Sequence, residues 1–316
     1  VTAERILDPQ LAAILAEVEA GGMFDEGIGF AEIRARFELT APMMWNPANL
    51  PVRATEDHEI PSPGGAIPVR VYTPTPAPAV LPVLVYFHGG GFVGGSIATA
   101  DAMTRYLARD AECIVVSVGF RLAPENPFPA SIDDCFAALG WAAANAESLG
   151  GDAARLAVGG DASGGTFAAV CAQLARDAGK PSLRFQLLLG PATDLANRHP
   201  SRDEFADDPL VPARMVEMVL DAYAPPGTDR SDPRCSPLAG DPRGLPPTYI
   251  LASEYDFLRD EERAYADALR DAGVDVTYRC WPGTTHNFFS MHDHLDVARA
   301  AMAEAAGALR AALRRR

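Results

Sequence analysis

Short apolar runs alternate with helical patterns along most of the chain. Six continuous apolar runs have the length of strands, and helical spacing of apolar residues fills most of the segments around them. The predicted strands are 83–87, 113–118, 156–158, 185–189, 248–251 and 274–279. The predicted helices are 99–111, 130–147, 163–178, 260–272 and 295–314. Buried strands separated by helices predict an α/β fold, with a mostly parallel sheet covered on both faces.

The first 73 residues follow other patterns. Residues 1–52 are predicted to be helical, in one stretch that ends at Gly21-Gly22 and a second that begins near Phe30 and ends near Pro42. The alternation of apolar and polar residues over 67–71, after a turn rich in proline and glycine, predicts an antiparallel hairpin.

A polar stretch with several prolines, at about 196–240, interrupts the strand–helix alternation. We expect this insertion to lie over the carboxyl ends of the strands. Open parallel sheets bind their ligands at those ends, so the insertion is predicted to cover the functional site.

Composition and charge narrow the function without identifying it. A chain of 316 residues, 48% hydrophobic and 22% charged, suits one large α/β domain with an added segment, or two small domains. A formal net charge of −15 argues against nucleic acid and anionic membranes as partners. The five cysteines are scattered and form no CxxC pair, and no signal peptide or apolar run of membrane-spanning length is visible. We expect a cytoplasmic protein with a small-molecule substrate; a homodimer is left open.

The segment 158–165, which reads VGGDASGG, has the pattern of a nucleophile elbow between a strand and a helix. In the pattern G-x-Nu-x-G, Gly160 and Gly164 place the nucleophile at Ala162. Because a methyl group cannot attack a carbonyl carbon, the sequence predicts a serine hydrolase scaffold in which alanine replaces the native serine. Ser163 is the alternative nucleophile, but its side chain would leave the turn in another direction.

The order nucleophile, acid, histidine restricts the search for the rest of a triad. His286 lies in a Gly/Thr-rich loop directly after the last predicted strand, and Asp256 follows the strand before it. These two are the predicted base and acid, with Glu254 as the fallback acid, while Asp260 is expected to cap the following helix. His292 and His294 could form a metal pair, but no further ligands are placed near them.

The motif HGGG at 88–91 follows a clear strand and predicts an oxyanion hole, a loop that aims backbone N–H groups at developing negative charge. Gly89, Gly91 and Gly94 also spell GxGxxG, which raises a nucleotide-binding loop as a rival. That motif requires a helix opening at its third glycine, and helical character starts only near Thr99. We therefore expect neither a cofactor nor a metal.

With these motifs in hand, the chain resembles the hormone-sensitive-lipase-like branch of α/β-hydrolase esterases over about 65–290. The stretch 120–130, FRLAPENPFPA, is similar to a stretch of that family, and the elbow and the HGGG loop match in order. The resemblance implies an eight-stranded sheet and a catalytic domain over 53–316. It also implies a helical cap built from 1–52 and an insertion at about 196–228.

The resemblance further implies a serine carboxylesterase that acts on short- to medium-chain acyl esters without a cofactor. It implies an oxyanion hole formed by three backbone N–H groups, those of Gly90, Gly91 and Ser163. The substrate pocket that it implies is lined by His88, Gly89, Phe92, Gly190, Asn287 and Phe288.

Three positions depart from the family pattern. Ala162 stands where the family has serine, Asn287 replaces the glycine usual after the catalytic histidine, and Gly190 stands where an aromatic residue is common. We expect Gly190 to leave room for a bulky acyl or alcohol group. The alternative function is a non-catalytic small-molecule-binding protein on a hydrolase scaffold, and the sequence does not separate an esterase from an amidase or acyltransferase.

Overall fold

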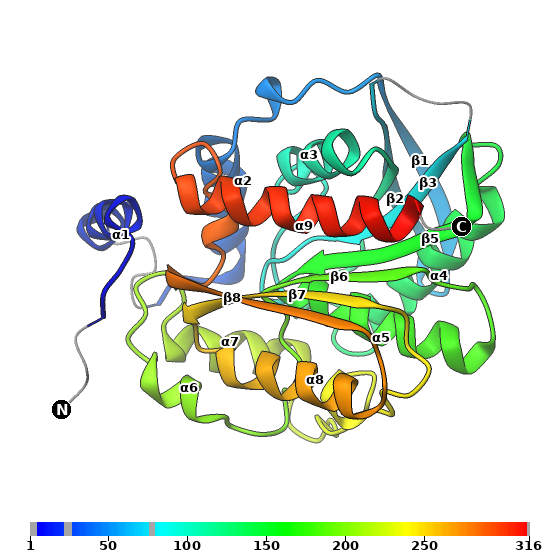
Figure 1. Cartoon of the computed structure of the whole chain (residues 1–316). Coiled ribbons are helices and arrows are strands. Elements are labelled where there is room, and N and C mark those ends of the chain that lie inside the picture. Colours follow the sequence, from blue (N-terminus) through cyan, green and yellow to red (C-terminus); the bar gives the residue numbers. More distant parts are fainter. Residues whose placement is uncertain (1–4, 22–26, 76–79, 315–316) are drawn as a thin grey trace.

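A single sheet of eight strands organises the chain, as described by a computed structural model that covers residues 5–21, 27–75 and 80–314 (Figure 1). The spatial order of the strands is β1-β2-β4-β3-β5-β6-β7-β8. Pairing is antiparallel between β1 and β2 and between β2 and β4, and parallel from β4 through β3 to β8. The strands are β1 (Ala54–Ser62), β2 (Gly65–Thr73), β3 (Leu81–Phe87), β4 (Ile114–Val118), β5 (Gly151–Asp161), β6 (Phe185–Leu189), β7 (Thr248–Tyr255) and β8 (Val276–Thr285).

Helices cover both faces of this sheet, which confirms the predicted α/β architecture. In Figure 1, α3 (Asp101–Ala111) and α9 (Asp296–Arg314) lie above the sheet. The helices α4 (Ala130–Asn145), α5 (Ser163–Ala178) and α8 (Arg259–Asp271) lie below it.

Burial on both faces of the sheet explains why the sequence of the central strand β3 is apolar throughout. Val83, Val85 and Phe87 pack into the core on one face of the sheet, and Leu84 and Tyr86 pack into the core on the other. Successive side chains of a strand point to opposite faces, so a strand covered on both faces has no position where water would favour a polar residue.

The predicted hairpin is present as β1 and β2. Ile60 pairs with Ile67, and Ser62 pairs with Gly65 across a two-residue turn. Gly65 adopts a φ of 120°, a conformation that glycine adopts without steric cost.

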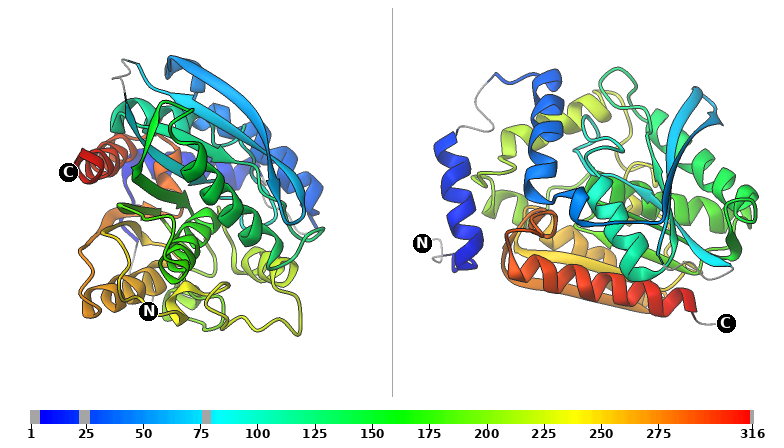
Figure 2. Two further views of the ribbon diagram at one scale, coloured as in Figure 1. Left: turned by 90° about the vertical axis from the view of Figure 1, so that its right-hand side faces the viewer. Right: turned by 90° about the horizontal axis from the view of Figure 1, so that it is seen from above.

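Four helices gather beyond the ends of the strands, at one end of the molecule (Figures 1 and 2). They are α1 (Pro9–Gly21) and α2 (Phe30–Met44) from the N-terminal region, and α6 (Pro200–Glu204) and α7 (Ala213–Tyr223) from the insertion. The expectation that the second N-terminal helix ends near Pro42 holds only loosely, because α2 continues to Met44. Pro42 lies in its last turn, where a proline removes a single helical hydrogen bond.

The remaining elements are short or support the core. In the part of the chain that the structure describes, the single-turn 3₁₀ helices are η1 (Pro47–Asn49), η2 (Pro237–Ala239) and η3 (Phe288–Ser290). The five cysteines are free, and all but the half-buried Cys280 are buried. Within the described ranges, no helix combines the length and the apolar character needed to cross a bilayer.

Candidate active site

Ala162 occupies a sharp turn between β5 and α5. Its φ of 47° and ψ of −117° lie outside the regions that a residue with a side chain normally adopts. The turn is held by its backbone, since Ala162 N–H donates to Leu189 O at 2.9 Å and Ala162 O accepts from Thr166 N–H at 3.2 Å. The strained strand-to-helix turn is the geometry of a nucleophile elbow.

The glycines around Ala162 are required by close backbone contacts. A Cβ atom at Gly160 would collide with Gly164 O, and one at Gly164 would collide with Phe87 O. A Cβ at Gly165 would approach Pro191 Cβ to 2.8 Å. The spacing of glycines that identified the elbow in the sequence therefore has a direct steric cause in the fold.

His286 and Asp256 meet although 30 residues separate them in the chain. Asp256 follows β7 and His286 follows β8, and these neighbouring parallel strands end side by side. The Nδ1 atom of His286 lies 2.9 Å from Asp256 Oδ2, and Leu258 N–H donates to Asp256 Oδ1 at 2.9 Å. Asp256 is 1% exposed and His286 4% exposed, so both atoms of this hydrogen bond are shielded from bulk water.

Opposing effects act on the acid–base behaviour of His286. Burial disfavours the charged imidazolium, but the Asp256 carboxylate stabilises it by charge and by hydrogen bonding, and Asp208 and Asp161 add negative potential. Together these carboxylates raise the pKa of His286 above its ordinary value. An imidazole with a raised pKa that is oriented by a carboxylate suits a general base.

The other acids considered from the sequence are engaged elsewhere. Glu254 Oε2 accepts from Gly283 N–H at 2.7 Å. Asp260 does not cap α8 as expected, because Leu258 occupies the N-cap position without a side-chain cap. Instead, Asp260 Oδ2 accepts from Ser201 N–H at 2.9 Å, at the start of α6.

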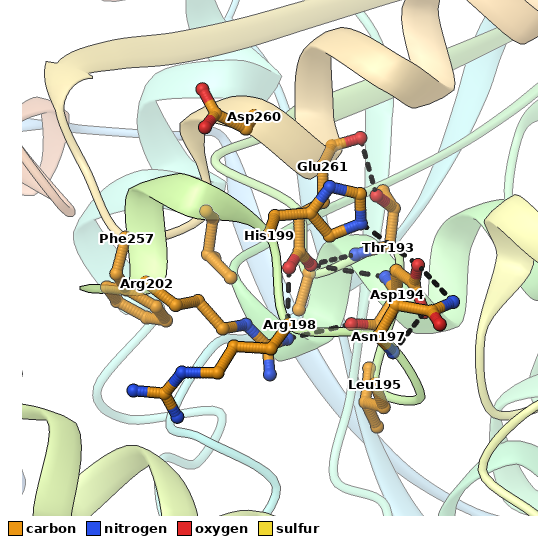
Figure 3. A network of polar contacts seen from close by, with 12 residues as sticks. Thr193, Asp194, Leu195, Asn197, Arg198, His199, Arg202, Phe257, Asp260 and Glu261 are labelled. Carbon is orange, nitrogen blue, oxygen red and sulfur yellow. Dashed lines mark hydrogen bonds and ion pairs between the residues drawn. The ribbon is translucent and has the colours of Figure 1, made fainter. Parts of the chain in front are cut away.

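A buried polar network joins α6, α8 and the chain segment that follows β6 (Figure 3). Arg202 of α6 lies 2.9 Å from Glu261 Oε2 of α8 and donates to Asp194 O at 2.7 Å. Glu261 Oε1 accepts from the N–H groups of Thr193 and Asp194, and His199 Nε2 lies 3.0 Å from Asp194 Oδ2. Sequence reasoning missed these residues, because the partners lie up to 68 residues apart and belong to no motif.

The HGGG segment forms a loop directly after β3. Gly90 and Gly91 have φ values of 133° and 60°, and Phe92 follows with a φ of 67°. Within the described residues, no backbone acceptor is paired with the N–H of Gly90 or Gly91. Ser163 is the first residue of α5, where the N–H has no acceptor within the helix.

A cavity of about 240 Å³ connects these parts. His286, Asp161, which precedes Ala162, and His88 and Gly90 of the HGGG loop all line it. Its cap wall is formed by Ile14, Val18, Arg36, Phe37, Thr40, Ala41, Met44, Leu210, Val211 and Met215. Apart from Arg36 and Thr40, the cap side of the cavity is thus apolar, and His88, Asp161 and His286 lie on the sheet side.

The structure places the residues of the implied pocket in two groups. His88, Gly89 and Asn287 line the cavity. Gly190, Phe92 and Phe288 are not among its lining residues. Phe92 stacks on Tyr223 with ring centroids 4.2 Å apart, and Phe288 is fully buried in the core.

Three of these residues have local features that bear on the chemistry. Burial lowers the pKa of His88 to about 4, so its ring is neutral at physiological pH, and it stacks on Phe120 at 4.2 Å. Asn287 has a φ of 60°, which explains why glycine suits this position and why asparagine is tolerated there. A Cβ at Gly190 would lie 3.8 Å from both His286 Cε1 and Glu262 Oε1.

The sequence also raised Ser163 as a nucleophile and His292 and His294 as a metal pair, and the structure shows what surrounds each of them. Ser163 Oγ is buried and has no hydrogen-bond partner in the described part of the chain. His292 stacks on Trp45 at 4.4 Å, and His294 Nε2 lies 2.8 Å from Met43 O. Across residues 5–21, 27–75 and 80–314, no group of three or more His, Cys, Asp or Glu side chains is arranged to hold a metal ion.

Comparisons with known proteins support the fold and point to a family. A family model described as alpha/beta hydrolase fold matches residues 84–290. Carboxylesterase NlhH of Mycobacterium tuberculosis is 41% identical over 315 residues, which cover 98% of this chain and 96% of that protein. Ethyl acetate hydrolase of Pseudomonas putida is 37% identical over 301 residues, covering 92% of this chain and 95% of that protein.

A solved structure is similar throughout its length. It is the crystal structure of a serine-to-alanine mutant of an alpha/beta hydrolase enzyme from the metagenome of Lake Arreo, Spain. It superposes with a TM-score of 0.91 at 41% identity, covering 97% of this chain and 98% of that chain.

Proposed function

Because the chain belongs to the alpha/beta hydrolase family, we propose that it is a serine carboxylesterase scaffold in which Ala162 replaces the nucleophile. The carboxylesterase relatives support ester hydrolysis as the activity. The finer proposal is that the serine form hydrolyses short- to medium-chain acyl esters, in the hormone-sensitive-lipase-like branch of the family. The observation that carries it is the strained φ of Ala162, at an elbow next to a cavity lined by His286.

With serine at position 162, its Oγ would form a bond to the carbonyl carbon of the ester while His286 Nε2 takes the hydroxyl proton. Asp256 holds Nδ1–H, which leaves Nε2 free to act as the base. The tetrahedral intermediate would then expel the alcohol, which receives that proton from His286. Water, activated by the same histidine, would release the acid and restore the serine.

The negative charge that develops on the carbonyl oxygen requires donors. We assign this role to the N–H groups of Gly90, Gly91 and Ser163. The free N–H groups of the glycine loop and the position of Ser163 at the start of α5 support the assignment, because the helix N-terminus adds its positive partial charge. The role given to its N–H also disfavours Ser163 as a substitute nucleophile.

Residues 1–52 and the insertion at about 196–228 are proposed to form the cap, and 53–316 the catalytic domain. The contribution of both segments to the cavity wall supports this division. We further propose a cytoplasmic enzyme that needs no cofactor, with a small ester as its partner. Free cysteines suit a reducing compartment.

We propose that Ala162 results from a serine-to-alanine replacement. A serine-to-alanine variant of a similar enzyme has been crystallised. Hydrolysis of p-nitrophenyl acetate and butyrate by the given chain and by Ala162→Ser tests the proposal. We expect activity in Ala162→Ser only, with a rate ratio on the order of 10⁶. Activity in neither protein would favour the binding-protein alternative, and activity in the given chain would point to Ser163.

A further inference from the structure

The glycine loop after β3 adopts a conformation that it cannot hold by itself. Gly90, Gly91 and Phe92 are three consecutive residues with positive φ, at 133°, 60° and 67°. A phenylalanine in the left-handed region is unfavourable, because its Cβ crowds the backbone. Such a conformation persists only where surrounding contacts determine it.

The catalytic domain supplies part of that support. Ala123 N–H donates to Phe92 O at 3.1 Å, and Gly94 N–H donates to Gly90 O at 2.9 Å. These bonds fix the turn within the loop. These bonds do not involve the carbonyl of Val93 or the outer surface of Gly94, and both contact another element.

One face of α2 supplies the missing contacts. Arg34, Phe37 and Glu38 are spaced i, i+3 and i+4, so they share a side of the helix. Arg34 Nε donates to Val93 O at 2.6 Å and Arg34 Nη2 donates to Ala123 O at 2.9 Å.

The other two side chains of this face extend the contact along the loop. The ring of Phe37 leaves so little space that a Cβ on Gly94 would lie 2.9 Å from its Cδ2 atom. Glu38 Oε1 accepts from Ser96 Oγ at 2.5 Å. The helix therefore follows the loop from position 93 to position 96.

We propose that Arg34 is a positioning residue, through which docking of the cap helix α2 fixes the glycine loop that stabilises the oxyanion. This inference rests on the proposed function, since it gives α2 a role in the same reaction. The cap then does more than enclose substrate: loss of the Arg34 contacts would leave the wall that α2 gives to the cavity, but the oxyanion hole would no longer be held in its formed state. The contacts of Arg34 would thus act on transition-state stabilisation, while other residues of the cap line the cavity and act on substrate binding.

The guanidinium of Arg34 has a second partner that provides a matched control. Its Nη1 and Nη2 atoms donate to Glu125 Oε1 and Oε2 at 3.0 and 2.7 Å. Glu125→Gln removes the charge of that ion pair but leaves the two bonds from Arg34 to backbone carbonyls. Arg34→Met removes all of these contacts and keeps an apolar stem of similar length.

The first test uses Ala162→Ser as the parent enzyme. We expect Arg34→Met to lower kcat by about 10- to 100-fold, less than or equal to the loss of one complete oxyanion donor. KM should change by less than about threefold, because ground-state binding is kept. In Arg34→Met, the inhibition constant of a trifluoromethyl ketone, which forms a tetrahedral adduct, should rise in parallel with the loss of kcat. The Glu125→Gln enzyme should have the kcat, KM and inhibition constant of the parent.

The second test needs no activity and uses the given chain. Amide hydrogen exchange over residues 88–96 should become faster in Arg34→Met and remain at the parental rate in Glu125→Gln. If Ala162→Ser proves inactive, the proposed function fails, and this exchange measurement still decides whether Arg34 holds the loop.

Two results would overturn the inference. One is unchanged exchange over 88–96 in Arg34→Met. The other is an Arg34→Met enzyme whose KM rises while kcat is preserved, since that would make α2 a wall for substrate only.

Discussion

Two loops of the candidate site are each supported by a helix, and the supports differ in burial. Helix α6 supports the loop that carries Asp256, and helix α2 supports the glycine loop after β3. The Asp256 loop is held by α6, since Ser201 Oγ donates to Phe257 O at 2.9 Å, and α6 is fixed to α8 by the pair Arg202–Glu261, whose side chains are 8% and 0% exposed. The support of the glycine loop includes Arg34, whose side chain is 31% exposed and donates to Val93 O and Ala123 O. A buried pair is coupled to the stability of the whole domain, whereas contacts of a partly exposed side chain can release without unfolding it. Orientation of the acid is thus built into the core, and the glycine loop depends on a contact that can open.

The largest effect should follow from removing the charge of the acid itself. In the Ala162→Ser enzyme, Asp256→Asn should lower kcat by about 10⁴, as in the best-known serine-protease case, because the amide favours the wrong imidazole tautomer. The fold should survive, since asparagine keeps the shape of the side chain. Steady-state kinetics with p-nitrophenyl butyrate and a thermal melt check the two parts, and a loss below about tenfold would mean that Asp256 is not the acid.

The pH profile sharpens this result. In Ala162→Ser, kcat/KM should fall as the pH drops through the raised pKa of His286, because only the neutral imidazole can accept the serine proton. Asp256→Asn removes the largest charge that stabilises the imidazolium, so the acid limb should move to lower pH. A limb that stays in place would show that Asp256 does not act on His286.

Breaking the buried support should destabilise the whole domain. Arg202→Met removes the partner of a fully buried carboxylate, so we expect the free energy of unfolding to fall by about 3–5 kcal/mol. The double variant Arg202→Met, Glu261→Met should recover much of this loss, since no charge is then left unpaired. Chemical denaturation of the given chain measures both, and Arg34→Met is the contrast, with an expected loss of about 1–2 kcal/mol.

The sequence predicts the central parts of the candidate site better than the helices that support them. The strands, the elbow at Ala162 and the loop at 88–91 follow from local patterns, because a buried strand and a steric need for glycine leave their mark on neighbouring residues. The juxtaposition of Asp256 and His286 follows from the rule that adjacent parallel strands end at one edge. These parts of the site follow from the amino-acid sequence alone.

The remaining parts depend on which distant surfaces meet. Arg202 contacts Glu261 across 59 residues, and Arg34 contacts Val93 across 59 residues as well, so no short pattern marks either contact. The family resemblance implied that Phe92 lines the pocket. Its backbone φ of 67° and its stack on Tyr223 direct the ring away from the cavity. The orientation of this side chain therefore depends on Tyr223, which is distant in the sequence.

Glu262 is a further acid that is buried in the core close to the candidate site. It is fully buried, and neither of its carboxylate oxygens has a hydrogen-bond partner in the described part of the chain. Burial, followed by the charges of Asp256, Glu261 and Cys280, raises its pKa well above the ordinary value. The folded protein then holds a proton that the unfolded chain releases as the pH rises past 4.5.

The sign of the resulting pH dependence is fixed by linkage. Above the unfolded pKa and up to the folded one, Glu262 should lower the free energy of unfolding by about 1.4 kcal/mol for each pH unit. Glu262→Gln and Glu262→Met both lack this titration, so their advantage over the parent should grow as the pH rises. Denaturation of the given chain at several pH values checks this, and a difference independent of pH would show that Glu262 ionises normally.

The smallest effect concerns Gly190, which we expect to leave room for bulky esters beside His286. In Ala162→Ser, Gly190→Trp should reduce kcat/KM for a bulky ester relative to p-nitrophenyl acetate by about tenfold, the order expected when a pocket is narrowed. Gly190→Ala is the matched control. It brings the same backbone strain at a φ of 59°, but its methyl group would reach Phe289 only at a normal contact distance of 3.4 Å. An active Ala162→Ser enzyme that already rejects bulky esters, or an equal ratio in the two Gly190 variants, would show that the space beside His286 does not select the substrate.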